Sequence, residues 1–397
     1  MSRVVLAMSG GVDSSVAAWL LREAGYEVIG LFMRHGQAAP AEESAACRTS
    51  GDGGKAGCCS AVDAADARHV AQQLDIPFYA LDFQQPFERI KRYFVAEYAA
   101  GRTPNPCIVC NSWLKFGKLF EYADSTNAEW VATGHYARLA TGADGQPALL
   151  RARDPQKDQS YVLWGIPRER LPRLLFPVGE HLKDEIRRIA GRLGLCHVAD
   201  KPDSQEICFV PDQDHARFIR QHRPWADSSG EIVTTDGTVV GHHDGLERYT
   251  VGQRRGLGVA LGQRRYVVRL DAATRRVVIG THEELATAEL TADGVNWLAG
   301  PGVETCGGVA AWDPSAGPCG TRFPAQVKIR YRSPPVEAAV EVLSNARFRI
   351  AFSEPCYGVA PGQAAVCYQG EQVLGGGWIE GPPGSLQQEV PLRQCEG

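Results

Sequence analysis

A glycine-rich turn near the start of the chain carries groups that suit phosphate chemistry. An apolar run of strand type precedes the turn Ser9–Ser15, whose sequence is Ser-Gly-Gly-Val-Asp-Ser-Ser, and apolar residues at helical spacing follow over 14–24. Adjacent glycines let the backbone approach a ligand closely, and the free N–H groups of the following helix attract anions. With the hydroxyls of Ser9, Ser14 and Ser15 expected to point toward one anion, the turn predicts a phosphate cradle. An ordinary glycine turn with a capping serine is the alternative, and the turn matches neither the usual NTPase loop nor the dinucleotide fingerprint.

Cysteines in a proline-bounded stretch form a second set of reactive groups. The segment 103–111 reads Thr-Pro-Asn-Pro-Cys-Ile-Val-Cys-Asn, and its prolines favour an extended chain. Cys110 is expected just before a helix that starts at Ser112, where the positive end of the helix lowers the pKa of a thiol. Cys110 is therefore the candidate nucleophile. Together with Cys107 it could instead be half of a structural zinc site, which would need a second Cys-x-x-Cys pair that the sequence lacks.

Two further polar stretches offer partners for this chemistry. Cys208 has polar and acidic neighbours in Asp-Ser-Gln-Glu-Ile-Cys-Phe, residues 203–209, which argues against a plain buried cysteine. The stretch Lys157–Gln159 places a cation, a carboxylate and an amide directly before an expected strand. It is a candidate contact for the phosphates of a nucleotide or a substrate.

The composition is that of an ordinary globular protein. The 397 residues are 44% hydrophobic and 22% charged, with a formal net charge of −4, which argues against nonspecific coating of nucleic acid but is compatible with a locally basic RNA site. No apolar run approaches the ~20 residues that span a bilayer, and no signal peptide is recognisable, so we expect a cytoplasmic protein with no membrane partner. Twelve cysteines in such a chain indicate redox, sulfur or metal chemistry. Cys47, Cys58, Cys59 and His69 could form a local metal site, although ordinary residues beside a helix start are the simpler interpretation.

Strand and helix patterns alternate through the first half of the chain. Strand patterns at 4–8, 28–33, 78–83 and 130–133 alternate with helical patterns at 14–24, 61–74, 86–100, 112–123, 169–175 and 182–193, and a loop is expected over 34–55. This alternation predicts an α/β fold with a doubly wound parallel sheet, whose ligand lies beyond the carboxyl ends of the strands. The turn Ser9–Ser15 and the pair Gly134-His135 both follow strands and are expected in the same crevice.

The second half of the chain is typical of β structure. Short alternating patterns at 231–233, 266–270 and 275–279 precede longer ones at 324–331, 336–342, 346–352 and 364–368, with an inserted loop at 300–320. We therefore expect the α/β domain over 1–210, a small β-rich middle domain over 211–286 and a C-terminal β-barrel over 287–397.

The motifs together resemble those of the bacterial tRNA-specific 2-thiouridylases, which belong to the ATP pyrophosphatase superfamily. The family's order is followed by Ser-Gly-Gly-Val-Asp-Ser-Ser, Thr-Pro-Asn-Pro-x-x-x-Cys-Asn, Gly-His-Tyr-Ala, Lys-Asp-Gln-Ser-Tyr, Asp-Ser-Gln-Glu-Ile-Cys-Phe, Gly-Gln-Arg-Arg-Gly-Leu-Gly, Arg-Tyr-Arg and Ala-Pro-Gly-Gln. These motifs span all three expected domains. The resemblance implies an enzyme, a tRNA-uridine 2-sulfurtransferase, in which ATP adenylates the oxygen at carbon 2 of the wobble uridine and a cysteine persulfide then displaces AMP.

The resemblance also implies a role for individual residues. Cys110 would carry the persulfide, Cys208 would release its sulfur by forming a disulfide, and Asp13 would help to hold Mg²⁺. ATP would contact Ala7, Met8, Ser9, Gly10, Gly11, Val12, Asp13, Ser14, Met33 and Gly134. The tRNA anticodon stem-loop would contact Asn105, Pro106, Cys107, His135, Lys157, Asp158, Gln159, Arg330, Tyr331 and Gln363, and also the turn 252–256. A cysteine desulfurase or a persulfide relay protein would supply the sulfur.

One residue departs from the family's pattern. Many members carry Asp where this chain has Cys107, and a thiol cannot serve as a general base in the way a carboxylate would. The set Cys107, Cys110 and Cys208 could instead ligate an iron–sulfur cluster that carries the sulfide. Two other functions stay open: an amide-forming synthetase of the ATP pyrophosphatase class, which needs no paired cysteines, and a noncatalytic tRNA-binding or sulfur-relay protein, which needs no intact phosphate loop.

Overall fold

The protein divides into two compact units, which are described separately. The structure, a computed structural model, describes residues 1–35, 61–142, 145–199, 201, 203, 207–210, 212, 214–224, 227–299, 304–305, 308–309 and 320–381. The first unit consists of Met1–Arg89, Cys110–Ser160 and Glu169–Asp214. The second consists of Ile90–Val109, Tyr161–Arg168 and His215–Gly397. The expected loop over 34–55 lies outside the described residues from residue 36 onward, as do Cys47, Cys58 and Cys59.

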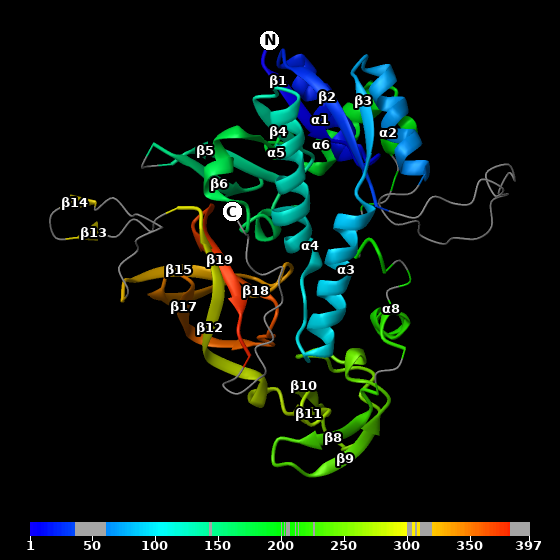
Figure 1. Cartoon of the computed structure of the whole chain (residues 1–397). Coiled ribbons are helices and arrows are strands. Elements are labelled where there is room, and N and C mark those ends of the chain that lie inside the picture. Colours follow the sequence, from blue (N-terminus) through cyan, green and yellow to red (C-terminus); the bar gives the residue numbers. More distant parts are fainter. Residues whose placement is uncertain are drawn as a thin grey trace, which may run out of the picture. The chain divides into compact units, whose positions relative to one another are not determined.

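A parallel sheet forms the centre of the first unit. Its strands are β1 (Arg3–Ala7), β2 (Glu27–Arg34), β3 (Phe78–Asp82), β4 (Trp130–Thr133) and β7 (Leu174–Leu175), in the order β3-β2-β1-β4-β7. All neighbouring strands run parallel (Figure 1). Chain order reverses beside β1, since β4 lies on one side of it and β2 on the other. The parallel sheet confirms the predicted fold class. In an open α/β sheet a ligand binds at this reversal point, so the Ser9–Ser15 turn, which follows β1, lies where a ligand is expected.

Helices pack on this sheet through their apolar faces. They are α1 (Val12–Glu23), α2 (Ala61–Gln73), α5 (Phe116–Ser125), α6 (Lys183–Arg192) and the short α7 (Cys196–Ala199). The core between helices and strands includes Val4, Leu6, Val16 and Phe32, each at most 1% exposed. The unit also contains the hairpin of β5 (Ala137–Thr141) and β6 (Pro147–Arg151). The helix α3 (Gln84–Ala99) begins in the first unit and continues into the second.

The helix around Cys110 starts earlier than the sequence predicted. The helical stretch begins with α4 (Pro106–Val109), continues as the π-helical η1 (Cys110–Lys115) and runs on into α5. Asn105 caps it, because its Oδ1 accepts a hydrogen bond from the Ile108 N–H at 3.3 Å, and Pro106 stands at the first helical position, where its missing N–H costs nothing. The prediction of a helix starting at Ser112 is therefore wrong, and Cys110 lies one turn inside the helical stretch.

One other helix prediction and one strand prediction also need correction. The stretch 169–175 is not an α-helix: the 3-10 helix η3 (Arg168–Arg173) contains Pro172, and β7 follows at once. The proline lacks the N–H that an α-helix would need at that point. A short 3-10 turn, η2 (Ser160–Val162), replaces the strand start expected after Gln159.

The second unit contains a helix that the sequence analysis missed and a small sheet. The helix α8 (His215–His222) precedes β8 (Gly230–Thr234), β9 (Val239–His243), β10 (Tyr266–Asp271) and β11 (Arg276–Gly280), with 3-10 turns η4 (Leu246–Arg248) and η5 (Glu283–Leu285). The sheet order is β10-β11-β8-β9, and its core includes Ile232, Val267 and Val277. The predicted β-rich character of this region is confirmed.

A closed barrel follows in the same unit. Its strands are β12 (Ala286–Trp297), β15 (Arg322–Lys328), β16 (Val336–Ser344), β17 (Arg347–Tyr357), β18 (Ala364–Gln369) and β19 (Gln372–Ile379). β12 pairs with both β17 and β19, which closes the barrel. Phe323, Ala325 and Val327 alternate inward along β15, as a half-buried strand requires. Of the expected loop at 300–320, the short strands β13 (Glu304–Thr305) and β14 (Gly308–Val309) pair, and most of the rest lies outside the described residues.

Candidate functional site

The turn after β1 has a backbone shape that only glycine accommodates. Gly10 has φ +74°, and a Cβ there would lie 2.2 Å from the carbonyl oxygen of Asp63. A Cβ on Gly134, which follows β4, would lie 2.8 Å from the backbone N of Ser14. The two glycines therefore bring the turn close to α2 and to the end of β4. Ala7 and Met8 stand directly before the turn, and Met33 lies at the carboxyl end of β2, so these residues, which the sequence predicted to contact ATP, gather at one edge of the sheet.

Serine hydroxyls shape this turn rather than all facing an anion. Ser14 Oγ accepts a hydrogen bond from Ser9 N–H at 3.1 Å and donates to Gly11 O at 3.1 Å. Ser15 Oγ donates to the same carbonyl at 2.9 Å, and Ser15 is fully buried. The expectation that the Ser15 hydroxyl points at an anion is therefore wrong, because this hydroxyl bonds back within the first turn of α1. The N-cap residue Gly11 supplies no side-chain cap, which leaves the first-turn amides of α1 to a ligand.

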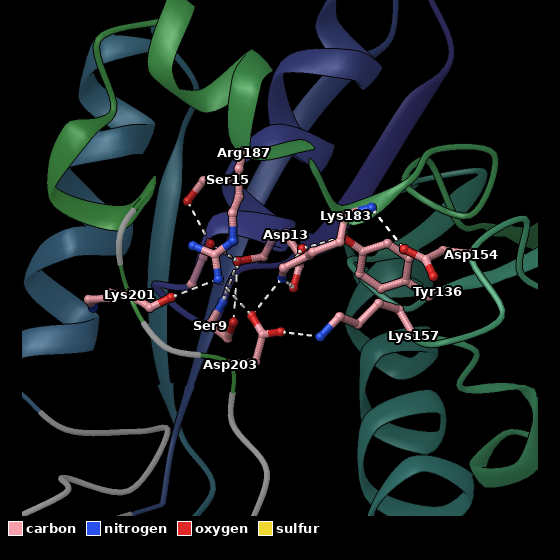
Figure 2. Close-up of polar contacts among 12 residues, drawn as sticks. Ser9, Asp13, Ser15, Tyr136, Asp154, Lys157, Lys183, Arg187, Lys201 and Asp203 are labelled. Carbon is pink, nitrogen blue, oxygen red and sulfur yellow. Dashed lines mark hydrogen bonds and ion pairs between the residues drawn. The ribbon is translucent and has the colours of Figure 1, made fainter. Parts of the chain in front are cut away.

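Asp13 lies at the centre of a partly buried polar network. Its Oδ1 and Oδ2 are each 2.8 Å from Lys183 Nζ, and Oδ1 accepts a hydrogen bond from Tyr136 Oη at 2.7 Å (Figure 2). Only 8% of the Lys183 side chain is exposed. Burial, together with the charge of Asp13, raises the pKa of Tyr136, so the phenol remains a donor. The carboxylate is thus held by one cation and one hydroxyl within the turn Ser9–Ser15, called the phosphate turn below.

A second carboxylate, Asp203, extends the network. It lies 2.8 Å from Lys183 Nζ, 2.7 Å from Lys157 Nζ and 3.1 Å from Arg187 Nη2 (Figure 2). Burial works to raise the pKa of Asp203, but hydrogen bonds from Lys157 and Lys183 outweigh it, and the pKa is lowered. Asp203 is therefore ionised at neutral pH, and three cations surround it.

Lys201 ties the same segment to the phosphate turn. Its Nζ donates to Gly10 O at 3.1 Å and to Asp63 at 2.9 Å, and it also pairs with Asp66. These carboxylates raise the pKa of Lys201 against the opposing effect of burial. The cation consequently fixes a carbonyl of the turn to the first turn of α2.

His135 is buried beside this site. It is 8% exposed, and its Nδ1 is 2.8 Å from Thr133 Oγ1. Burial, and to a lesser degree the charge of Lys115, lowers its pKa well below the usual value, so the imidazole is neutral at pH 7. In this structure the ring packs near Phe116 and Phe176.

Asp158 and Gln159 make hydrogen bonds within the first unit. Asp158 Oδ1 accepts from the backbone N–H groups of Ala152 and Ser160, both at 3.1 Å. Gln159 Oε1 accepts from Tyr136 N–H at 2.9 Å, and Gln159 N–H donates to Tyr136 O at 2.8 Å. Both side chains therefore shape the loop that carries Lys157.

The cysteines singled out by the sequence differ in exposure. Cys107 is exposed, Cys110 and Cys208 are half-buried, and none of the three forms a disulfide. Cys208 lies in a turn in which Val210 N–H donates to Ile207 O. Within the described residues, no group of three or more His, Cys, Asp or Glu side chains could hold a metal ion.

The second unit holds the other residues expected to contact tRNA. Gln363 is 9% exposed, and its Nε2 donates to the carbonyls of Thr103 and Pro104 at 3.0 and 3.2 Å. Arg330 Nη2 donates to Val251 O at 2.7 Å and to Gly358 O at 2.6 Å, and burial lowers its pKa. Both side chains support neighbouring loops of their own unit.

A cationic cavity in the second unit is lined by residues between Arg254 and Arg265. Its volume is about 480 Å³, and the lining includes Arg254, Arg264 and Arg265. Arg254 belongs to the 252–256 turn that the sequence proposed as an RNA contact.

The described chain contains no helix long and apolar enough to cross a membrane.

Comparison with known proteins identifies the family. The family model described as the tRNA methyl transferase HUP domain matches residues 2–212. The tRNA methyl transferase PRC-barrel domain model matches 216–281, and the aminomethyltransferase β-barrel domain model matches 288–379. The tRNA-specific 2-thiouridylase MnmA of Rhodopirellula baltica is 50% identical over 405 residues, covering 96% of each chain. The chain belongs to the tRNA-specific 2-thiouridylase family. The enzymes of that name from Geobacter metallireducens and Geotalea uraniireducens are 47% and 46% identical, each over 95% of this chain and 96% and 95% of their own.

In this 2-thiouridylase-family chain, the structure brings together several polar residues whose proximity the motifs did not reveal. Lys183, Arg187, Lys201 and Asp203 surround the phosphate turn, and Tyr136 donates to Asp13. A signal was present in part: Lys183 and Arg187 are four residues apart in a helical pattern and so share a face. Nothing in that spacing showed that the face is buried against Asp13.

Proposed function

We propose that the protein synthesises 2-thiouridine at the wobble position of tRNA, using ATP and a persulfide sulfur. One observation carries the proposal: a single compact unit contains both the phosphate turn, with its carboxylate and cations, and the thiols Cys110 and Cys208. The names of relatives 46–50% identical over nearly the whole chain support it. An amide-forming synthetase would have no use for the pair of thiols.

ATP would bind with its phosphates on the turn after β1. The first-turn amides of α1 and the cations Lys183, Lys157 and Arg187 supply the positive charge that phosphates need. The adenosine would lie along Ala7, Met8, Met33 and Gly134, at the carboxyl ends of β1, β2 and β4. Asp13 fits Mg²⁺, since this ion is held by one or two carboxylates together with phosphate oxygens, and bound Mg²⁺ would neutralise charge on the phosphates.

The reaction balances in three steps. The oxygen at carbon 2 of the uridine attacks the α-phosphorus of ATP, and pyrophosphate leaves. The terminal sulfur of a Cys110 persulfide then attacks carbon 2, and AMP leaves with the uridine oxygen. Finally the Cys208 thiolate attacks Cys110 Sγ and forms a disulfide with it. The former terminal sulfur of the persulfide leaves Cys110 and remains on carbon 2, which gives 2-thiouridine. An external dithiol must reduce the Cys110–Cys208 disulfide before the next turnover.

The tRNA would be held by residues of both units. We propose contacts from Asn105, Pro106, Cys107, His135, Lys157, Asp158, Gln159, Arg330, Tyr331 and Gln363, and from the cavity around Arg254. Single-stranded anticodon bases cost little to extrude into a pocket, which suits a wobble uridine. A cysteine desulfurase or a persulfide relay protein would deliver the sulfur in the cytoplasm. The domain limits 1–210, 211–286 and 287–397 complete the proposal.

One reaction tests the function. Purified protein is incubated with an unmodified tRNA transcript, ATP, Mg²⁺ and a persulfide-generating desulfurase, and nucleosides are identified by mass spectrometry while iron is measured in the same sample. We expect 2-thiouridine from iron-free protein. Thiouridine only from iron-containing protein would replace the persulfide route by a cluster route, and no thiouridine in either form would refute the function.

A further inference from the structure

A buried carboxylate in the second unit has no part in the proposed reaction. Glu97, near the end of α3, is fully buried, and its two oxygens accept hydrogen bonds from Arg102 Nε at 2.9 Å and Nη2 at 2.6 Å. The Arg102 side chain is 11% exposed. A buried ion pair adds little stability compared with apolar residues of the same volume, but the paired bonds of an arginine and a carboxylate fix the orientation of both side chains. The pair therefore suits the fixing of a geometry.

The end of α3 turns the chain so that this pair can form. Gly101 has φ +69°, and its N–H donates to Tyr98 O at 3.0 Å, while Arg102 N–H donates to Glu97 O at 2.9 Å. These two bonds form the Schellman motif, in which a left-handed glycine ends a helix. Arg102 is thereby returned to the residue five positions before it, and the segment Arg102–Pro104 starts from a fixed point.

The loop before β18 holds the same segment. Thr103 N–H donates to Pro361 O at 2.7 Å, and Gln363 Nε2 donates to Thr103 O at 3.0 Å. Gly362 has φ +88°, and a Cβ there would lie 3.0 Å from both Glu97 Oε2 and Thr103 O. Only a glycine lets this loop come so close. The segment is therefore held by α3 and by a barrel loop through contacts within the second unit.

The segment leads directly into the helical stretch that carries Cys110. Asn105 follows it and caps the stretch by accepting a 3.3 Å hydrogen bond from Ile108 N–H, and α4 continues as η1, whose first residue is Cys110. Asn105 can cap the helix only while the preceding backbone keeps it at the N-terminus. A shift of the segment would therefore be passed along the chain to Asn105 and to the helical turn of Cys110.

We propose that Glu97 and Arg102 are positioning residues for sulfur transfer. With Gly362 they form a clamp that holds the segment Arg102–Pro104, so that Asn105 meets the wobble base and the helix presents the Cys110 persulfide to carbon 2. Reacting atoms must lie about 3–3.5 Å apart, and a misplacement of about 1 Å can cost about 100-fold in rate. The inference rests on the proposed function, which gives Asn105 and Cys110 their roles.

The first pair of test variants changes the carboxylate. Glu97→Gln keeps the shape of the side chain but removes the negative charge of the pair, so thiolation at saturating tRNA should fall about 10- to 100-fold per folded molecule. Glu247→Gln is the matched control, because Glu247 is a buried carboxylate of η4 that pairs with Arg220 in the same unit at 2.8 Å. The control should lose stability in urea but keep the wild-type rate of thiolation.

The second pair leaves every charge in place. Gly362→Ala adds a methyl group 3.0 Å from Glu97 Oε2 and Thr103 O, closer than such atoms normally approach, so the same loss of thiolation is expected. Gly370→Ala is its control, because Gly370 also has a positive φ, +58°, but a Cβ there meets nothing within 4 Å. Alanine at a positive φ strains the backbone in both variants, so the comparison isolates the contact with the clamp.

Two further measurements separate positioning from a general loss of stability. Amide hydrogen exchange, followed by mass spectrometry without tRNA or ATP, should become faster over residues 103–110 in Glu97→Gln and Gly362→Ala and stay unchanged there in both controls. Binding of a nonhydrolysable ATP analogue, measured by equilibrium dialysis, should keep the wild-type affinity in all four variants, because the phosphate turn belongs to the first unit.

The combined results decide whether the clamp positions the helix. Faster exchange and slower thiolation in both clamp variants, with neither change in the controls, would support it, and Gly362→Ala alone carries the comparison if Glu97→Gln does not fold. Faster exchange with wild-type thiolation would overturn the inference, because the pair would then be merely structural. Unchanged exchange, or a loss of analogue binding as large as the loss of thiolation, would also overturn it. A wild type that binds the analogue but makes no 2-thiouridine would instead refute the proposed function, and the inference with it.

Discussion

Replacing Lys183 by Met tests the polar network at its most buried cation. Met keeps most of the volume and the packing against Tyr136, whose ring centroid lies 5.6 Å from Lys183 Nζ, but removes the charge. Asp13 and Asp203 would then face each other without their shared counter-ion. Breaking a fully buried ion pair costs about 3–5 kcal/mol. The side chains of Asp13 and Asp203 are 30% and 23% exposed, so we expect a smaller loss of about 2 kcal/mol in the free energy of unfolding.

Nucleotide binding should fall in the same variant. A charge-assisted hydrogen bond is worth about 1.5–3 kcal/mol, which corresponds to a loss of roughly 10- to 150-fold in affinity for the ATP analogue. Urea denaturation gives the stability and equilibrium dialysis gives the affinity. Lys118→Met is the control, because Lys118 forms a surface pair with Glu121, and its removal should change stability by less than about 0.5 kcal/mol.

A double variant sharpens this prediction. If Asp203 is destabilised by the loss of Lys183, the most buried of its three cations, Lys183→Met combined with Asp203→Asn should be more stable than Lys183→Met alone. The reasoning is refuted if Lys183→Met is as stable as Lys118→Met and binds the analogue like the wild type. It is also refuted if the second substitution lowers stability further.

Three more predictions concern other parts of the structure. His135 stays neutral in the folded protein, so below about pH 6.5 the unfolded chain binds a proton that the folded protein does not, and the free energy of unfolding should drop by at most about 1.4 kcal/mol per pH unit. His135→Gln should lose that part of the pH dependence in urea unfolding between pH 7.5 and 5.5. An unchanged pH dependence would contradict the buried neutral imidazole. Gln363→Met leaves two backbone carbonyls without their donor and should destabilise the protein by about 1–3 kcal/mol, whereas Gln326→Met, at a surface pair, should not; equal urea midpoints would argue against this support. Cys110→Ala should abolish thiolation but retain pyrophosphate release from ATP in the presence of tRNA, and Asp13→Ala should stop both; a folded Cys110→Ala protein without pyrophosphate release would contradict the separation of the two steps.

Sequence patterns determined most of the first unit because its elements are regular. The glycine turn, α1 and the strands β1, β2, β3 and β4 combine strong apolar periodicity with clear turn signals, and each lies within a few residues of its prediction. The start of the Cys110 helix was misplaced because the two prolines in 103–111 are typical of an extended segment. Only the Asn105 cap and the tolerance of Pro106 at the first helical position explain why the helix begins there.

The buried cations lay beyond sequence reasoning for a different reason. A lysine in an amphipathic helix is normally a solvated residue, and Lys183 becomes part of the site only because α6 packs on α1 and turns its first residue toward Asp13. Asp203 was noted merely as an acidic neighbour of Cys208. Its three cations come from the loop before η2 and from α6, a convergence that only the tertiary structure reveals.

The most direct test of the account follows the oxygen atom that sulfur replaces. A tRNA transcript with isotopically heavy oxygen at carbon 2 of the wobble uridine is thiolated by the wild type in one turnover, and the AMP produced is analysed by mass spectrometry. Adenylation followed by sulfur displacement predicts that the heavy oxygen appears in the phosphate of AMP, one atom for each 2-thiouridine formed. AMP that carries only ordinary oxygen while thiouridine is made would contradict the central claim, because the uridine oxygen would then have left by another route.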